Sequence, residues 1–374
     1  MRKKLYKWHS IGALIAMLPL LIISVTGSIL VFKVELDTFL MPDKMQVTSI
    51  NPGERVSLDV LMTNVKSKYP NYEIGSWELF DDKSRTDTAY LIKQHTTDWS
   101  KLYVNQYTGK LLSTPVGTSD DLTDWLLDLH YKLLLETNGM FLGAIVSLLL
   151  LFLGISGVIL YRKFWLNFFT LRLGLARRIF FSDLHKIIGI SSSPVILILA
   201  FTGAYWNISL VIHEVSEHIV EEPYLIKDQL HNNKLSIQTL LDSNEEVIKG
   251  FEATYLLMPF EPDMDIMFYG TVNPTNPLNS NYSSTISYDK DSGKMLHFED
   301  VRSATSLHIT IDSFRKLHFG HFGGLTSKLI WCVLGLSPLI LALTGLYLYL
   351  HKNRNRKIMH ISRVKNRKTL ESTK

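Results

Sequence analysis

Four long uncharged runs alternate with mixed polar segments along the 374-residue chain, at residues 11–32, 139–161, 187–212 and 329–350. Each run is about as long as the roughly 20 residues that a helix needs to cross a hydrocarbon core of ~30 Å. Because no water is available there to satisfy peptide groups, such runs must be helical. The pattern therefore predicts an α-helical membrane protein with four transmembrane helices.

The two long segments between these runs, residues 33–128 and 213–316, have the pattern of small α+β domains. Each contains an amphipathic helix, expected at 57–70 in the first and at 234–247 in the second. Alternating strands follow, expected at 88–95, 101–113, 264–272 and 284–300. The turns NQYTGK and DKDSGK place an Asn or Asp, a Thr-Gly or Ser-Gly pair and a Lys at the same offsets. We therefore expect two related exterior domains.

Charge predicts the orientation of the chain. Residues 1–10, 162–186 and 351–374 hold nineteen of the 39 basic residues and only two of the 35 acidic ones. Short basic segments stay in the cytoplasm. We expect a multi-pass membrane protein in contact with membrane lipid, with cytoplasmic termini and middle loop and with large domains on the exterior side. The basic pI is then a consequence of topology and does not indicate a nucleic-acid partner.

The chain is a tandem duplication in which each copy carries histidines at fixed places. His9–Gly27 and His185–Gly203 have the same length, with a proline near the middle of each. His130–Gly157 and His318–Gly345 also match in length, and each combines a lead-in with a membrane run, so the membrane segments extend over 129–161 and 317–350. The two types occur in alternating order, which predicts two repeats of helix, exterior domain and helix.

The duplicated histidines lie at two depths in the membrane. His9 and His185 are expected at the cytoplasmic level, and His130 and His318 at the outer level. Ionisable groups within an uncharged bundle are functional candidates, and imidazoles on facing helices hold heme iron. Parallel repeats arrange around an axis along the membrane normal. We therefore expect His9 with His185 and His130 with His318 to hold two hemes of the b type. The other interpretation is that each imidazole is an interfacial side chain with its tip in water.

The glycines that end these segments are expected beside the same hemes. Gly27 and Gly203 are predicted near the outer histidines, and Gly157 and Gly345 near the inner ones. A residue without a side chain allows a macrocycle to approach the backbone. Ordinary close helix packing explains such glycines equally well.

Other histidines remain as alternative ligands, and the pairing is less secure than the set. These are His321, which shares a face with His318 if the lead-in stays helical, His351 at the inner end of the fourth run, and His213 at the outer end of the third. His95, His231 and His297 are interpreted as surface residues of the exterior segments.

The motifs together resemble the PepSY-associated transmembrane helix family, sometimes described as iron-regulated inner-membrane proteins. They are the H-x2-G and TG of the first run, LHYKLLLETNG and ISG of the second, H-x3-G and TG of the third, LHFGHFGG and TG of the fourth, and the hairpins YVNQYTGKLL and SYDKDSGKML. No single motif is specific, but their order and spacing cover nearly the whole chain. The exterior regions 33–128 and 213–316 would then be PepSY-like domains.

The resemblance implies a heme-containing ferric-siderophore reductase, with its histidine positions at His9, His130, His185 and His318. Its substrate would be a ferric siderophore or another iron chelate. The electron donor would be cytoplasmic or a membrane quinol, since the chain has no G-x-G-x-x-G dinucleotide motif. His321 stands where a variable or basic residue is expected, which leaves a swap of outer ligand open.

Two alternative functions remain beside a reductase. One is a non-enzymatic PepSY module that binds or regulates a partner, and the other is an accessory protein of iron or heme uptake. A transporter is not favoured, because the four runs hold no charged residue for a coupling ion.

Overall fold

A computed structural model describes residues 2–47, 53–80, 82–166, 170–216, 223–273 and 276–372. They form two compact units. The helical unit comprises Met1–Val31, Leu129–Val211 and Lys328–Lys374, and the sheet unit comprises Phe32–Asp128 and Ile212–Ser327.

Within the described residues, four helical segments are long and apolar enough to cross a membrane, as the sequence predicted. They are α1 (Arg2–Leu30), α6 (Glu136–Leu160), α7 (Arg177–Glu214) and the last segment, built from α10 (Gly324–Gly335) and the start of α11 (Ser337–Ser372). The last one is interrupted between α10 and α11, where Pro338 occupies the first turn of the new helix, a position that tolerates its missing N–H.

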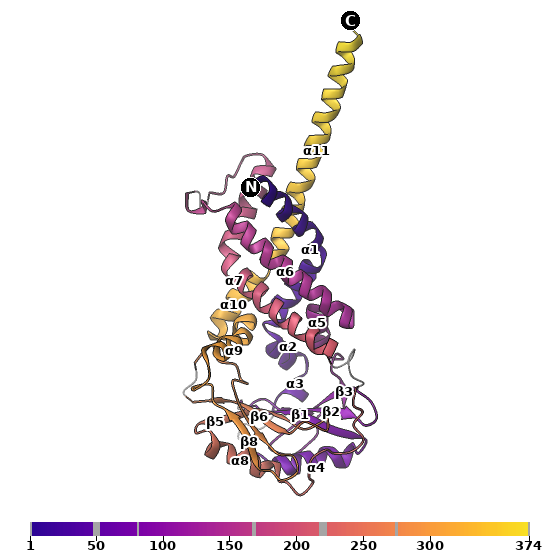
Figure 1. The fold of residues 1–374 in the computed structure, drawn as a ribbon, viewed down its shortest axis with the longest axis vertical. Helices are drawn as coiled ribbons and strands as arrows, with labels where there is room; N and C mark the ends of the chain where they lie inside the picture. Colours follow the sequence, from indigo (N-terminus) through magenta and orange to yellow (C-terminus); the bar gives the residue numbers. More distant parts are fainter. Residues whose placement is uncertain are drawn as a thin grey trace. The chain divides into compact units, whose positions relative to one another are not determined.

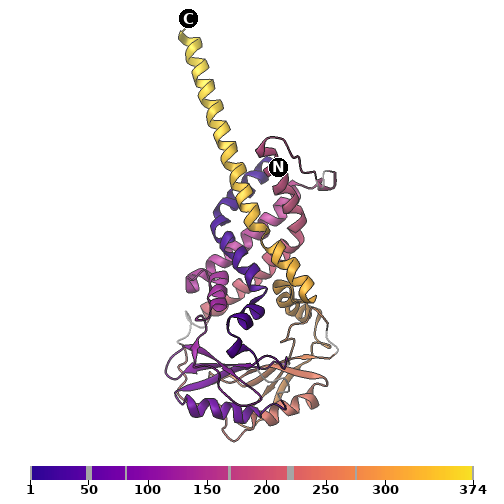
Figure 2. The ribbon, with the colours of Figure 1, turned by 180° about the vertical axis from the view of Figure 1, so that it is seen from behind.

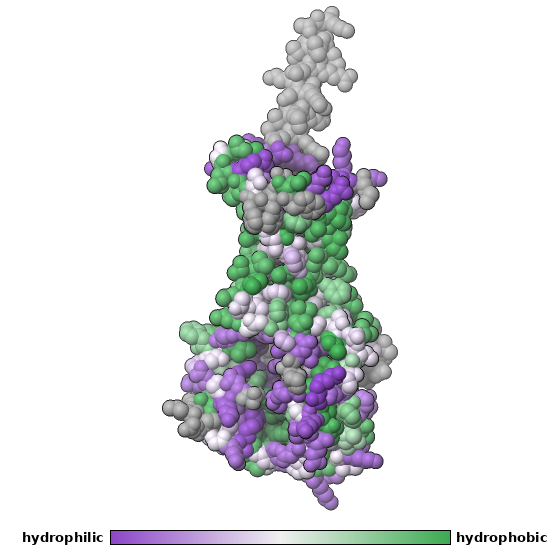
Figure 3. Space-filling view, turned by 90° about the vertical axis from the view of Figure 1, so that its left-hand side faces the viewer, coloured by the Kyte–Doolittle hydropathy of each residue, from purple (hydrophilic) through white to green (hydrophobic). Residues whose placement is uncertain are grey.

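The surface of the helical unit is apolar. Large side chains such as Ile15, Leu18 and Ile145 are more than half exposed, and Figure 3 shows a band of hydrophobic residues over these helices. Such a surface is stable when lipid covers it. In the interior, α1 packs closely along α6 and α11, whereas the part of α7 that the structure describes forms no comparably close backbone pair.

The sheet unit contains one antiparallel sheet of eight strands in the order β4-β3-β2-β1-β5-β6-β7-β8. The bounds are β1 Tyr72–Glu78, β2 Asp87–Lys93, β3 Trp99–Val104, β4 Val116–Gly117, β5 Phe251–Leu257, β6 Ile266–Val272, β7 Ser284–Tyr288 and β8 Met295–Glu299. β1 pairs with β5 through Trp77 and Leu256. The two exterior regions therefore share one sheet, and the two strands that join them are those that the sequence pattern did not predict.

The duplication is visible in the details of the sheet. A bulge falls between Ile74 and Ser76 of β1, and another between Ala253 and Tyr255 of β5. Gly109 and Gly293 close the two predicted turns with φ angles of 70° and 69°. The amide of each glycine donates to the carbonyl four residues earlier at 2.8 Å. Glycine suits this left-handed conformation because it has no Cβ.

Helices α4 (Leu58–Lys68) and α8 (Ile237–Val247) lie side by side on one face of the sheet (Figures 1 and 2). Both were predicted. Their apolar sides cover a core in which Trp77 and Phe268 are fully buried. The other described helices are α2 (Lys33–Leu40), α3 (Pro42–Met45), α5 (Leu122–Tyr131), α9 (Ser306–Phe319) and the short η1 (Phe164–Leu166).

Candidate functional site

His9 of α1 forms a hydrogen bond with a hydroxyl of the neighbouring helix α6. The distance from His9 Nδ1 to Ser156 Oγ is 2.7 Å, and Ser156 is buried. The Ser156 hydroxyl proton is directed to the carbonyl of Leu153 at 3.3 Å. Its oxygen can therefore accept from His9, in the tautomer that carries the imidazole proton on Nδ1.

His185 of α7 repeats this arrangement with α11. Its Nδ1 lies 2.8 Å from Thr344 Oγ1. The Thr344 hydroxyl donates to the carbonyls of Ile340 and Leu341 at 2.8 and 3.2 Å. Thr344 is buried, so water does not compete for this contact. The Thr344 oxygen can therefore accept from His185 in the same tautomer.

His130 of α5 forms the third such contact, with α1. Its Nδ1 lies 3.1 Å from both Thr26 Oγ1 and the carbonyl oxygen of Ile23. A carbonyl only accepts, so Nδ1 must be the donor. With the proton on Nδ1, the Nε2 atom of each of the three histidines keeps its lone pair, as a metal-ligating imidazole requires.

The two inner histidines lie near each other. His9 and His185 are within electrostatic range of one another. Among the described residues, neither Nε2 atom has a hydrogen-bond partner. The duplication thus brings one imidazole of each repeat to a common place, each beside a hydroxyl of a neighbouring helix.

Three of the four predicted glycines lie directly against these imidazoles. A Cβ added to Gly27 would be 2.6 Å from His130 Cε1, closer than real side chains approach. At Gly345 and Gly157 the corresponding distances to His185 and His9 are 3.4 and 3.7 Å. The first of these glycines therefore makes room for the imidazole ring itself, a reason that the sequence interpretation did not include.

The fourth glycine, Gly203, is buried in α7 next to Thr202. The Thr202 hydroxyl donates to the carbonyl of Ile198 at 2.7 Å, as Thr26 does to Ile22 at 2.8 Å. The Thr-Gly pair of α7 thus has the same local geometry as its copy in α1.

His318 and His321 belong to the sheet unit and do not share a helix face. His318 lies in the last turn of α9, which ends at Phe319 with Gly320 in the left-handed conformation. His321 follows this cap, so the condition that the lead-in stays helical from His318 to His321 is not met. Glycine at this position terminates the helix because it adopts a positive φ without strain.

The remaining alternative ligands lie within α11 and at the end of α7. His351 stacks on Tyr347 of α11, with ring centroids 6.1 Å apart. His213 is exposed in the last turn of α7. His231 is half-buried rather than a surface residue, and burial together with Lys66 lowers its pKa to about 4.

A buried lysine fixes the helix that leads to His130. Lys101 of β3 is almost completely buried and pairs with Asp121 at 2.6 Å and with Asp124. Tyr103 donates to Asp121 at 3.0 Å. These contacts attach the first turn of α5 to the sheet.

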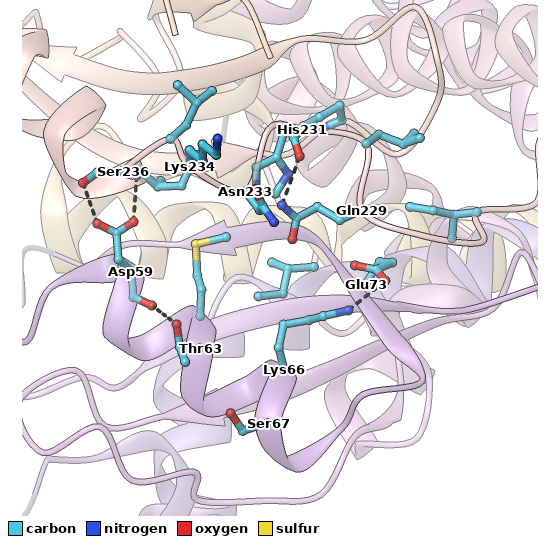
Figure 4. Close-up of a pocket in the computed structure, with 17 residues that line it drawn as sticks. Asp59, Thr63, Lys66, Ser67, Glu73, Gln229, His231, Asn233, Lys234 and Ser236 are labelled. Atoms are coloured by element: carbon cyan, nitrogen blue, oxygen red, sulfur yellow. Dashed lines mark hydrogen bonds and ion pairs between the residues drawn. The ribbon is translucent and has the colours of Figure 1, made fainter. Parts of the chain in front are cut away.

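A cavity of about 480 Å³ lies in the sheet unit between α4 and residues 226–237 (Figure 4). Lys66 pairs with Glu73 at 2.7 Å across its floor. Asp59 accepts from Ser236 Oγ and the amide of Ile237 at 2.6 and 2.7 Å, which caps α8. The two carboxylates that line the cavity, those of Asp59 and Glu73, are thus paired with groups of the protein.

The sequence interpretation missed the hydroxyls that contact the histidines. It took the Ser-Gly and Thr-Gly pairs as markers of glycine alone. The signal was present, since a hydroxyl precedes the glycine in all four segments, at Thr26, Ser156, Thr202 and Thr344.

Comparison with known proteins agrees with this architecture. Over 81 residues the chain is 36% identical to the uncharacterized protein PA4219 of Pseudomonas aeruginosa, a match that spans 22% of this chain and 21% of that protein. The family model described as the PepSY-associated TM region matches residues 6–352. The chain therefore belongs to the family of the PepSY-associated TM region.

Proposed function

We propose that this protein is a di-heme electron-transfer protein of a bacterial inner membrane, which reduces a ferric siderophore or a similar chelate in the periplasm. The observation that carries the proposal is the repeated imidazole–hydroxyl contact of His9, His185 and His130. It leaves Nε2 of each ring with a lone pair inside a bundle of apolar helices.

The donor set fits heme. His9 and His185 would hold the inner heme. The equal spacing of the two copies in the sequence assigns His130 and His318 to the outer heme. Near Gly27, the buried Ser28 Oγ has no hydrogen-bond partner among the described residues, and the same holds for Trp206 Nε1, one turn beyond Gly203. Buried polar atoms without partners are rare in native proteins. A bound group with polar substituents would satisfy them.

A heme held by two histidines would supply one-electron transfer at this place. The residues of this chain would orient the histidines and keep water away from them. Ser156 and Thr344 keep the two inner imidazoles in one tautomer and orientation. The apolar helices exclude water from the histidines, and no side chain is required as a general acid, general base or nucleophile.

The basic segments 1–10, 162–186 and 351–374 support a cytoplasmic position for the termini and the middle loop. Reducing equivalents would then enter from a cytoplasmic or quinol donor and leave on the side of the sheet unit. An oxygen-donor chelator binds Fe(II) more weakly than Fe(III), since Fe(II) is the softer ion.

Reconstituted vesicles test the proposal. Purified protein is inserted into vesicles with a reductant inside and a ferric chelate and an Fe(II) indicator outside. We expect external Fe(II) with the wild-type chain and with the control His297→Ala, whose side chain lies on the exposed edge strand β8. His185→Ala should abolish it.

Equal Fe(II) formation in protein-free vesicles, or an active His185→Ala variant, would contradict the proposal. A chain that folds, binds no heme and reduces nothing would favour the non-enzymatic module.

A further inference from the structure

A row of aromatic side chains crosses the junction between the two halves of the sheet. Glu78 of β1 is the direct cross-strand partner of Tyr255 on β5, and Tyr255 is the partner of Tyr269 on β6. Direct partners lie on the same face of a sheet. The ring of Tyr282 completes a triangle, with centroids 5.6 Å from Tyr255 and 6.2 Å from Tyr269.

Two arginines flank this row. The guanidinium carbon of Arg315 lies 4.3 Å from the ring centroid of Tyr282 and 5.5 Å from that of Phe319. Arg85 lies 3.7 Å from the ring of Phe80, and both arginines act electrostatically on Glu78. We call Glu78, Arg85, Tyr255, Tyr269, Tyr282 and Arg315 the tyrosine–arginine patch. Its members are half-buried, so each keeps some accessible surface.

The patch contains more positive than negative groups, with the guanidinium groups of Arg85 and Arg315 and the single carboxylate of Glu78. Burial raises the pKa of Glu78, whereas Arg85 and Arg315 act in the opposite direction. Burial also raises the pKa of Tyr282 to about 12, so its phenol remains protonated at neutral pH. Within the described part of the chain, no hydrogen bond is made by the hydroxyls of Tyr269 and Tyr282. The patch thus offers two guanidinium groups and unused hydroxyl donors.

The patch reaches the proposed outer heme ligand through one helix. Arg315 precedes His318 by three residues on α9, a spacing that places both on one side of the helix, about 5 Å apart along its axis. Phe319 contacts both, since its ring lies 5.8 Å from that of His318. A ligand held by Arg315 is therefore within one helical turn of His318.

We propose that the tyrosine–arginine patch binds the ferric substrate, and that this substrate is an anionic chelate in which phenolate or catecholate rings hold the iron. This inference rests on the proposed function, because it names the substrate class for that reaction. Arginine on aromatic rings recognises flat anionic ligands by charge and by stacking. The ferric complex of a trihydroxamate, in contrast, has no net negative charge and no aromatic rings.

Gallium separates binding from reduction. Ga(III) forms chelates of the same shape and charge as Fe(III) but is not reduced. Binding of Ga(III) tris(2,3-dihydroxybenzoate) and of a Ga(III) linear trihydroxamate to the full-length protein is measured by equilibrium dialysis. We expect the anionic catecholate complex to bind at least tenfold more tightly than the trihydroxamate.

Variants locate the site. Arg315→Gln should weaken catecholate binding about tenfold, Arg315→Lys should restore only part of it because the planar stacking is lost, and Tyr282→Phe should have a smaller effect than Tyr282→Leu. Lys294→Gln is the matched control, since it removes the same charge from the exposed turn between β7 and β8. Circular dichroism spectra identify any variant that does not fold.

Equal affinity for the two gallium chelates, or a folded Arg315→Gln variant that binds catecholate like the wild type, would overturn the inference even if the protein reduces iron. Selective binding of the gallium catecholate by a chain without reductase activity would support the patch and refute the proposed function.

Discussion

Thr344 accepts a hydrogen bond from Nδ1 of His185 at 2.8 Å, and the first copy of the duplication repeats this contact between Ser156 and His9 at 2.7 Å. Two helix pairs that are far apart in sequence thus present their imidazoles in the same way. Each hydroxyl also has a helix carbonyl to which it can donate, which leaves its oxygen free to accept from the ring. This contact favours the tautomer on which the proposed ligation depends.

Replacing Thr344 with Val should impair ligation by His185 while the helix remains intact. Loss of the hydrogen bond to the second nitrogen of a ligating histidine typically lowers metal affinity 10- to 100-fold. We therefore expect a lower heme content or a shifted midpoint potential. Thr344→Ser should behave like the wild type. Ser192→Ala is the control, because Ser192 also bonds its own helix, to the Ile188 carbonyl at 2.7 Å, and has no histidine partner. A Thr344→Val protein with an unchanged spectrum and potential would show that the hydroxyl is not needed.

Gly27→Ala should displace His130. The new Cβ would be 2.6 Å from His130 Cε1, so the ring or the helix must move. Gly12→Ala on the same helix is the matched control, since its Cβ would make ordinary contacts of 3.7–3.8 Å with Phe152 and Leu153. We expect a changed heme spectrum for Gly27→Ala and none for Gly12→Ala. Identical spectra would refute the close approach.

Lys101→Met should destabilise the sheet unit by about 1–3 kcal/mol, because it removes the buried ammonium group that Asp121 and Asp124 share. The two carboxylates keep Tyr103 and Lys33 as partners, at 3.0 and 2.9 Å. Lys93→Met, at an exposed position of the neighbouring strand, should change stability little. Chemical denaturation followed by circular dichroism measures both. Equal midpoints for the two variants would show that the buried lysine does not fix α5.

The low pKa of His231 predicts that the folded protein loses stability in acid. Burial and Lys66 lower its pKa from 6.5 to about 4 in the folded state, so the unfolded chain takes up the proton first. Above pH 6.5 the histidine is neutral in both states, and the free energy of unfolding keeps its full value. As the pH drops from 6.5 to 4, we expect this free energy to fall by on the order of 1–2 kcal/mol, after allowance for solvent screening.

The apparent melting temperature of the full-length chain and of His231→Gln, measured from pH 7.5 to 4, tests this expectation. The difference between the two proteins should change across that window. Parallel curves would show that His231 does not contribute.

The sequence was sufficient for the helices and insufficient for the way the sheet closes. Long uncharged runs identify membrane segments without tertiary information, and α4 and α8 follow from amphipathic spacing. β1 and β5 were missed, because their burial depends on pairing between residues as distant as Trp77 and Leu256. No local pattern records such a partner.

For the candidate site, the sequence predicted most of the residues but not the contacts between them. Spacing identified His9, His185, His130 and the adjacent glycines, since a duplication preserves distance along the chain. It did not show that Ser156 and Thr344 accept from the imidazoles, because that contact depends on which helix face meets which. The end of α9 at Phe319 was also missed, since a glycine terminates a helix only when the chain takes a positive φ there.

Heme stoichiometry of the purified full-length chain tests the central claim most directly. The protein is produced in heme-replete cells, and its heme is measured as the pyridine complex alongside the reduced-minus-oxidised spectrum. We predict two b-type hemes per chain in the wild type and one in His185→Ala. A colourless wild-type protein, or a stoichiometry that His185→Ala leaves unchanged, would contradict the account.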